Sequence, residues 1–378
     1  RGHGLRGWIL CGVGLGWALL SKGPVALLHI LPVPLLAPWW MRDGRPARWR
    51  GWYAGLALAF LIGVTLVLAW AIPAGLAGGQ AYRDAIFLRQ TADRMVAGAA
   101  HGRPLWWYLP VVPLLLVPWV LWPSAWRAVA TVRRLTAESG TRLCLIWGAV
   151  VFTAFVLISG KQAHYLLPVL PALALLWDRG WAAAGEDGAN HSLALPAGFL
   201  ALAGIAAAVA PHLPGLERQV PWIGAVRPGP AVLLVVAAGA VVILGRRLAP
   251  GRLPVLVTAT GLVLSALLHL AVMPALRPNF DVTPLALELR AYQERGYAIA
   301  HLGKYNAQWH FAARMTEPFA VVADSAEADS WMEEHPRHVI IRYARAAQAA
   351  AREAGGERCS PFRDRWVCLA VGGSAKEP

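Results

Sequence analysis

Charged residues are scarce in this chain, and several motifs of soluble enzymes are absent from it. Only 15% of the 378 residues are Asp, Glu, Lys or Arg, whereas 57% are hydrophobic and the mean hydropathy is +0.48. This balance is too apolar for two or three soluble domains and is typical of a multi-span membrane protein. The sequence has no Gly-rich phosphate loop, no zinc-ligand spacing and no nucleophile elbow, so it offers no motif for those chemistries.

Cysteine is also rare, because the chain has only four, too few for a disulfide framework. Cys11 and Cys144 lie in apolar segments, where a cysteine behaves as a small apolar side chain. Cys359 and Cys368 lie in a polar C-terminal region. An oxidising compartment would allow these two to form a bridge, but the sequence does not decide between a bridge and free thiols.

Acidic residues are outnumbered, with 21 Asp and Glu against 35 Lys and Arg, which gives a net charge of +14. Much of the excess lies in short loops beside apolar segments, where the positive-inside rule explains it without a nucleic-acid partner. We therefore expect no nucleic acid among the partners. If the segments alternate, three arginine-rich loops share one side, which we assign as cytoplasmic: 42–50, 127–142 and 246–252.

Nine apolar segments are long enough to cross or nearly cross a hydrocarbon core of about 30 Å. Tryptophans sit at the ends of many of them, as expected at membrane interfaces. We therefore predict a transmembrane region over residues 1–273 with about nine spans, and a soluble region over 274–378 on the outer side. The segments are Trp8–Leu20, Pro24–Trp40, Trp52–Ile72, Leu105–Trp122, Leu143–Ile158, Tyr165–Trp177, Leu193–Ala210, Pro230–Leu244 and Leu253–Met273.

The region 274–378 has the pattern of a small α/β domain. Two segments have helical spacing, and four short apolar or alternating runs are typical of strands. The predicted helices are Pro284–Arg295 and Ala326–Glu334, and the predicted strands are Tyr297–Leu302, Phe319–Ala323, Val339–Tyr343 and Arg363–Val371.

A lysine and a histidine lie one helical turn apart at the mouth of an apolar segment, in the run Lys161-Gln-Ala-His-Tyr-Leu-Leu-Pro-Val169. Ionisable groups at the end of a membrane span are candidates for function, because hydrocarbon cannot solvate them. The run therefore indicates a basic pocket at the membrane surface. The alternative, a snorkelling Lys161 beside a capping His164, remains equally open from the residues alone.

Two further basic features fall on the same predicted outer side. Lys22 lies in Ser21-Lys-Gly-Pro24, where glycine can end one helix and proline can begin the next. Arg83, Arg89 and Arg94 fall on or near one face of a helix that could lie along the interface and meet a lipid headgroup. An interfacial anchor and a solvated charged face are the respective alternatives. His29 and His269 lie within spans, where a hydrogen-bonded interior histidine is the expectation.

Several stretches, in this order, resemble landmarks of bacterial membrane glycosyltransferases of the family 39 or aminoarabinose-transferase type. The resemblance covers almost the whole chain, and its specificity comes from the order of individually weak pieces. The stretches are Ser21 to Leu28, Gln90 to Arg94 with Pro104 to Pro110 and Pro118-Trp119, Gly160 to Pro168, Leu302 to Arg314 and Pro361 to Trp366.

This resemblance implies an all-α multi-pass membrane bundle of the GT-C type, partial in this chain, followed by a small α/β extracytoplasmic domain. Members of the family bind a polyprenyl-phosphate sugar in an outward-facing cavity. They transfer the sugar to lipid A, another glycolipid or protein at the outer face of the inner membrane. The family reaction needs a carboxylate in the first external loop. We expect that residue to lie upstream of Arg1, in an N-terminal third that the 378 residues lack, so the catalytic acid is not named.

Fixed cations near the donor phosphate would stabilise the charge that develops as the glycosidic bond breaks. Together with the resemblance, this predicts substrate-binding roles for Lys22, Arg94 and Lys161, with His164 as a donor and Tyr165 lining the site. No cofactor is evident, and the participation of a divalent metal stays open. The expected partners are the polyprenyl-phosphate sugar, a lipid or protein acceptor and membrane lipids.

Two other functional classes are compatible with a basic span mouth. A transporter of an anionic lipid would be expected to show inverted repeats, and we find no internal repeat. An O-antigen polymerase or ligase also handles polyprenyl-linked sugars, but a large loop between spans would favour it, whereas a soluble region after the last span favours the transferase.

Overall fold

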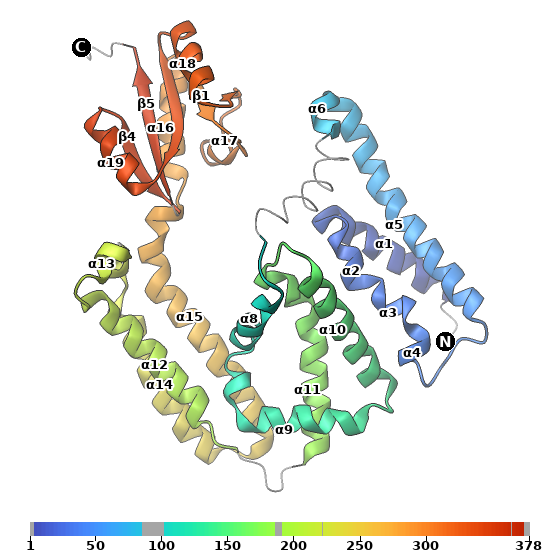
Figure 1. The fold of residues 1–378 in the computed structure, drawn as a ribbon. Coiled ribbons are helices and arrows are strands. Elements are labelled where there is room, and N and C mark those ends of the chain that lie inside the picture. The colour runs from blue at the N-terminus through green and yellow to red at the C-terminus, as the bar shows by residue number, and fades with distance from the viewer. Residues whose placement is uncertain (1–3, 85–101, 186–190, 221, 364, 374–378) are drawn as a thin grey trace. The chain divides into compact units, whose positions relative to one another are not determined.

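The computed structural model describes residues 4–84, 102–185, 191–220, 222–363 and 365–373 (Figure 1). The chain divides into two compact units, one formed by Arg1–Leu200 with Ala237–Leu262 and the other by Ala201–Val236 with Val263–Pro378. The three boundaries between these units each fall inside a helix. The predicted boundary at residue 273 also lies inside a helix, because Pro274 and Pro278 are accommodated within it without ending it.

Six helices in the described residues are long and apolar enough to cross a membrane, and they match six of the nine predicted segments. Their side chains are almost wholly apolar, which suits the hydrocarbon, and the helical backbone satisfies its own hydrogen bonds. They are α1 (Gly4–Lys22), α5 (Trp49–Ala77), α10 (Ser139–Leu157), α12 (Ala194–Val209, continued to His212), α14 (Pro228–Arg247) and α15 (Leu253–Phe280).

The other three predicted segments form shorter pieces, because prolines remove backbone donors within them. Whether these pieces cross the membrane is not decided by their length, so the count of nine spans stays a prediction. The first consists of α2 (Val25–Ile30), α3 (Pro32–Leu35) and α4 (Ala37–Trp40). The second consists of η2 (Leu105–Trp107), α8 (Tyr108–Leu115) and η3 (Trp119–Leu121), and the third of η5 (Ala163–Val169) and α11 (Leu170–Ala184).

Small residues bring α1 and α5 into close contact. A Cβ atom on Gly12 would lie 2.7 Å from the carbonyl oxygen of Ala59, and one on Gly63 would lie 3.1 Å from a side-chain carbon of Leu15. Glycine at these crossing points lets two apolar helices pack backbone to backbone, as membrane helices commonly do.

Short elements lie between the longer helices: α6 (Gly79–Asp84), α9 (Pro123–Val132), η4 (Arg133–Leu135), η6 (Ala210–His212), α13 (Leu216–Gln219), η7 (Ile223–Ala225) and η8 (Pro250–Arg252).

The tryptophans are not all interface residues. Trp39 and Trp106 are largely exposed, as expected for a membrane interface. Trp122, however, is fully buried, with its ring centroid 4.9 Å from that of Trp181 and 5.8 Å from that of Trp177. This indole packs against α11, so its position at a segment end did not indicate lipid contact.

The C-terminal part of the second unit is a five-stranded sheet with helices on both faces (Figure 1). The strand order is β2-β1-β3-β5-β4, in which β1 is parallel to β2 and β3, and β5 is antiparallel to β3 and β4. The strands are β1 (Ala298–Leu302), β2 (Ala320–Val322), β3 (His338–Ala344), β4 (Arg358–Phe362) and β5 (Arg365–Gly372), and the helices are α16 (Thr283–Glu294), α17 (Gln308–Ala313), α18 (Ser325–Glu334) and α19 (Ala346–Ala354).

Alternate residues of the central strands build the two cores of this domain. Ile299 and Ile341 pack with Leu289 of α16 on one face, whereas Ala300 and Ile340 pack with α18 on the other. The two predicted helices and four predicted strands are confirmed, each with ends shifted by at most a few residues. The sequence did not predict α17, α19 or β4.

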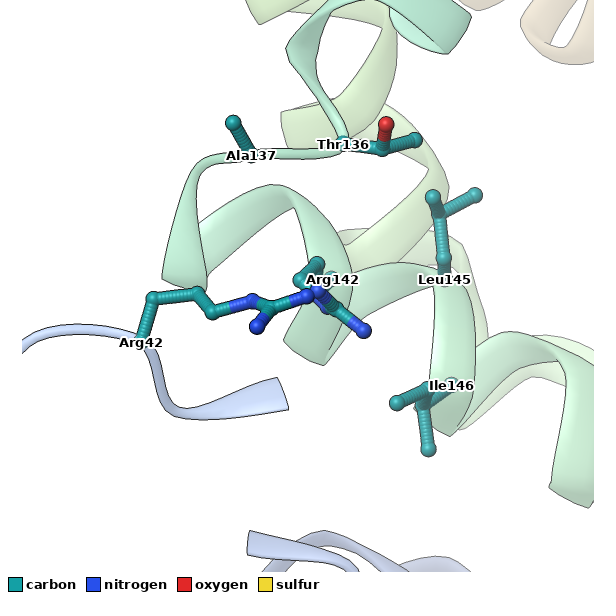
Figure 2. A pocket seen from close by; sticks show the side chains of 6 residues that line it. All are labelled: Arg42, Thr136, Ala137, Arg142, Leu145 and Ile146. Atoms are coloured by element: carbon teal, nitrogen blue, oxygen red, sulfur yellow. The ribbon is translucent and has the colours of Figure 1, made fainter. Parts of the chain in front are cut away.

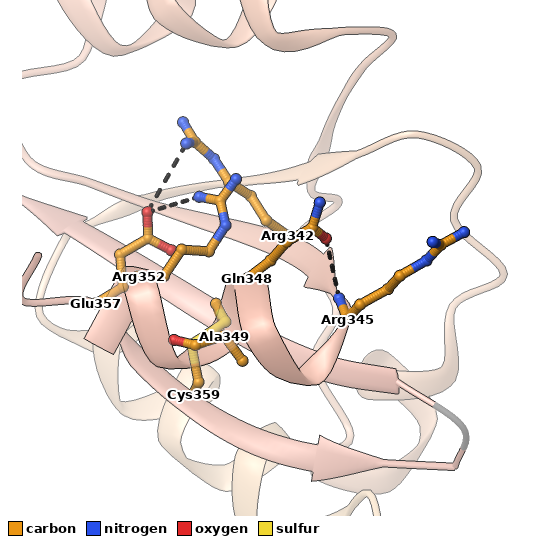
Figure 3. Close-up of a disulfide and its surroundings, with 8 residues drawn as sticks. Arg342, Arg345, Gln348, Ala349, Arg352, Glu357 and Cys359 are labelled. Atoms are coloured by element: carbon orange, nitrogen blue, oxygen red, sulfur yellow. Dashed lines mark hydrogen bonds and ion pairs between the residues drawn. A yellow bond between two sulfur atoms is a disulfide. The ribbon is translucent and has the colours of Figure 1, made fainter. Parts of the chain in front are cut away.

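A disulfide joins Cys359 of β4 to Cys368 of β5, and this settles the alternative that the sequence left open. The two residues are direct partners in the antiparallel ladder. Beside the bridge, Glu357 accepts from Arg352 of α19 at 2.9 Å and lies 3.8 Å from Arg342 of β3 (Figure 3). These contacts attach the edge strand to both the helix and the centre of the sheet.

Candidate functional site

Two segments far apart in the sequence meet beyond the C-terminal end of α10. Gly102 and Gly160 form an antiparallel bridge, and the backbone N–H of Arg103 donates to the carbonyl oxygen of Ser159 at 3.1 Å. The phenol of Tyr108, at the start of α8, donates to the carbonyl oxygen of Gln162 at 3.0 Å. We call the region formed by residues 102–108 and 158–165 the mouth.

Lys161 lies at the centre of the mouth, and only 1% of its surface is exposed. Its ammonium donates to the carbonyl oxygen of Ile158 at 2.8 Å and to that of Arg103 at 3.1 Å. Ile158 is the C-cap of α10, so the lysine satisfies a terminal carbonyl and adds a favourable charge at the negative end of the helix dipole. An ammonium has three N–H donors, and these two bonds use two of them.

Arg103 is a second cation of the mouth that the sequence did not single out. Its guanidinium lies 4.2 Å from the ring centroid of Trp107, and its side chain is half-buried. Neither Arg103 nor Lys161 has an ion pair with any carboxylate that the structure describes. Local sequence gives little signal for this grouping, because it depends on a bridge between Gly102 and Gly160, which are 58 residues apart.

Tyr165 and His164 lie on η5, directly after Lys161. The ring of Tyr165 is half-buried and lies 5.2 Å from Phe155 of α10, in a cluster that includes Tyr108 and Leu166. His164 is exposed, and its ring meets Tyr165 edge-on at 4.8 Å. The histidine is therefore open to a ligand, whereas the tyrosine has one side fixed by packing.

Lys22 is the last residue of α1 and is exposed. As predicted, glycine ends this helix, with Gly23 at φ +65°, and α2 begins after Pro24. Val25 of α2 packs against the Tyr165 cluster, so the α1–α2 connection borders the same cluster as the mouth.

Arg94 lies outside the described residues, together with Arg89, so its predicted role stays a prediction. Arg83 is described, and it is exposed on α6. The expectation for the two span histidines was wrong. His269 is exposed on α15, and the buried Nδ1 of His29 has no hydrogen-bond partner in the described part of the chain; its ring instead lies 5.2 Å from Phe155. No group of three or more His, Cys, Asp or Glu within the described ranges could hold a metal ion.

No protein-family model matches the chain. A curated relative from Pseudomonas aeruginosa strain UCBPP-PA14, an undecaprenyl phosphate-alpha-4-amino-4-deoxy-L-arabinose arabinosyl transferase, is 32% identical over 283 residues, which are 74% of this chain and 48% of the relative. A protein of the same name from Edwardsiella ictaluri is 28% identical over 240 residues, 62% of this chain and 42% of the relative. The chain is homologous to the aminoarabinose transferases. It spans about half the length of the curated relatives that it matches.

Solved structures show that the fold is shared as well. The aminoarabinose transferase from Cupriavidus metallidurans in its apo state superimposes with a TM-score of 0.62 at 18% identity, covering 96% of this chain and 68% of the other. The same protein bound to undecaprenyl phosphate gives a TM-score of 0.59. The predicted fold class, a GT-C type helical membrane bundle with a small α/β domain, is thus confirmed. The apolar helices and the homology identify an integral inner-membrane protein.

Proposed function

We propose that this chain acts in the transfer of a sugar from a polyprenyl-phosphate donor to lipid A, another glycolipid or protein. The observation that carries the proposal is the mouth itself, where Lys161 and Arg103 are held together in a chain homologous to arabinosyl transferases. The solved relative binds undecaprenyl phosphate, and a lipid phosphate is the ligand that two cations at a membrane surface suit best.

The chemistry assigned to the mouth is stabilisation of the leaving phosphate. As the bond between sugar and phosphate breaks, negative charge develops on the phosphate oxygens, and preorganised cations lower the energy of that state. The third N–H of Lys161 and the guanidinium of Arg103 are the described donors for it. We assign His164 as a donor and Tyr165 as a residue that lines the site, both from η5, and Lys22 at the end of α1 as a further cation. Arg94 is proposed as a further cation on sequence grounds alone.

The acceptor side of the reaction needs a base or an orienting carboxylate. Within the described residues, no carboxylate is hydrogen-bonded to or paired with Lys161, Arg103 or His164. We therefore assign the phosphate-binding half of the chemistry to the mouth and leave the base unassigned.

We further propose that the mouth and the C-terminal domain lie on the periplasmic side. The arginines at the other ends of the spans favour a cytoplasmic location for those loops. The bridge between Cys359 and Cys368 supports an oxidising compartment for the domain, because disulfides persist in the periplasm and are rare in the cytosol.

Transfer of undecaprenyl-phosphate aminoarabinose to lipid A, followed by the mass of the lipid, tests the proposal. Arg103→Gln should reduce transfer because it removes a cation while keeping an amide donor. Arg133→Gln is the matched control, since Arg133 is an exposed arginine outside the mouth. Equal transfer by Arg103→Gln and the control would contradict the assignment of the mouth. Failure of the parent protein to modify lipid A, a glycolipid or protein would contradict the activity.

A further inference from the structure

A second basic cavity lies at the opposite end of α10, about 28 Å from the mouth by the rise of a 19-residue helix. Its volume is about 480 Å³. It lies between the connection from α4 to α5 and the start of α10, and Figure 2 shows Arg42 extending across it toward Arg142. The lining residues are Arg42, Thr136, Ala137, Arg142, Leu145 and Ile146.

The backbone of Arg42 is fixed to the helix that carries Arg142. The N–H groups of Arg42 and Asp43 both donate to the hydroxyl of Ser139, at 2.8 and 3.2 Å. Arg45 then folds back, and its Nε donates to the carbonyl oxygen of Met41 at 2.9 Å, across a turn with Gly44 at φ +66°. Because Ser139 and Arg142 lie on the same first turn of α10, the two arginines start from a rigid common base.

No protein carboxylate neutralises these two guanidinium groups in the described part of the chain. Neither Arg42 nor Arg142 forms an ion pair there, although Asp43 is adjacent in sequence to Arg42. Glu138, the acid closest to Arg142 along the chain, is instead paired with Arg179 at 2.7 Å. Arginine stays protonated in proteins, so two like charges share one cavity and repel each other. An anion bound between them would remove this repulsion.

The remaining wall of the cavity is apolar and belongs to a membrane span. Leu145 is 37% exposed, and Ile146 lies beside it on α10. Trp39, on the neighbouring α4, is 60% exposed and has the position of an interface anchor. A soluble anion would gain nothing from this wall, whereas an acyl chain would cover it.

We propose that this cavity binds an anionic phospholipid of the leaflet opposite to the mouth. The headgroup phosphate accepts hydrogen bonds from Arg42 and Arg142, and the first part of an acyl chain lies along Leu145 and Ile146. The charge-assisted bonds from two guanidinium groups give the site its preference for anionic over zwitterionic lipid.

Native mass spectrometry of the purified chain, after exchange into phosphatidylglycerol or phosphatidylcholine, measures this preference. We expect the parent to retain one more phosphatidylglycerol than the variant Arg42→Gln with Arg142→Gln, and no such difference with phosphatidylcholine. The control is Arg133→Gln with Arg134→Gln, which removes the same charge from exposed positions outside the cavity. Equal loss of lipid from both double variants, or no loss from either, would overturn the proposal.

Two further measurements separate this site from its alternatives. Ser139→Ala leaves both arginines in place but frees the backbone of Arg42, so we expect it to weaken phosphatidylglycerol retention in part. Full retention in that variant would contradict the role of Ser139 in fixing Arg42. Inorganic phosphate should not displace the lipid, and displacement by phosphate alone would identify the occupant as a soluble anion rather than a lipid.

Discussion

The ammonium of Lys161 lies 3.1 Å from the backbone carbonyl oxygen of Arg103, although 58 residues separate the two in the chain. The lysine thus holds the segment that carries the second cation of the mouth. A substitution of Lys161 would therefore remove its charge from the mouth and would also remove the hydrogen bond that holds the backbone of Arg103.

Lys161→Ala in the protein should reduce sugar transfer by more than about 100-fold, the scale of losing a charge-assisted contact in the transition state. The thermal midpoint should fall as well, because the carbonyls of Ile158 and Arg103 lose their donor. Steady-state kinetics at matched expression separates the two effects. Near-normal turnover with a lower midpoint would leave Lys161 a structural role alone.

Cysteine labelling in intact cells tests the orientation. Ala183→Cys, near the end of α11, should be shielded from an impermeant thiol reagent, whereas Ala350→Cys on α19 should react. Both positions are exposed and helical, so neither substitution strains the backbone, unlike one at Gly185 with φ +67°. The parent, with Cys11 and Cys144 as its free thiols, sets the background. The reverse pattern would place the C-terminal domain on the cytoplasmic side.

The C-terminal domain should lose stability in mild acid through His301. This histidine is fully buried on β1, its Nδ1 donates to the carbonyl oxygen of Gly303 at 3.1 Å, and its Nε2 has no partner among the described residues. Burial lowers the pKa of His301, so the unfolded chain binds the proton first and stability falls as pH drops below about 6.5.

Hydrogen exchange of the β1 amides between pH 7.5 and pH 5, corrected for intrinsic rates, measures this effect. His301→Gln should flatten the pH dependence over that window. Asp281 acts in a different window: its hydrogen bonds with Thr283 lower its pKa, so its contribution is lost only as pH falls below the ordinary value for Asp. An unchanged pH dependence in His301→Gln would show that another group titrates.

Reduction of the disulfide should loosen β4 more than β3. The bridge closes a short loop, since Cys359 and Cys368 are nine residues apart, and its loss costs about 2–3 kcal/mol in the chain-entropy view. Cys359→Ala with Cys368→Ala should therefore increase exchange of the β4 amides, while Cys11→Ala should not. Equal protection of β4 in the oxidised and reduced protein would show that the pairs of Glu357 are sufficient to hold the strand.

Composition and periodicity predicted the membrane class, six of the long helices and most of the C-terminal sheet. These features depend on local patterns, such as the apolar run of α5 or the alternation of β3. The sequence did not predict β4, because its Cys359, Ser360 and Pro361 do not resemble a strand, and the pairing with β5 overrides that local preference.

The candidate site was predicted only in part, for a similar reason. Lys161 and Tyr165 stand out because ionisable and polar groups are rare at span ends. Arg103 does not stand out, since its position depends on the bridge between Gly102 and Gly160. From the sequence, the arginines of the second cavity indicate only the topology, and the fold shows that Ser139 brings Arg42 close to the helix that carries Arg142.

The strand order of the C-terminal sheet has a consequence for the time at which that domain can form. The central strand β3 is flanked by β1, which precedes it in the chain, and by β5, which consists of residues 365–372. Until those residues have been synthesised and released, β3 has an open edge and β4 has no partner. A chain cut before residue 365 would therefore present the unpaired apolar edge of β3 to chaperones and proteases.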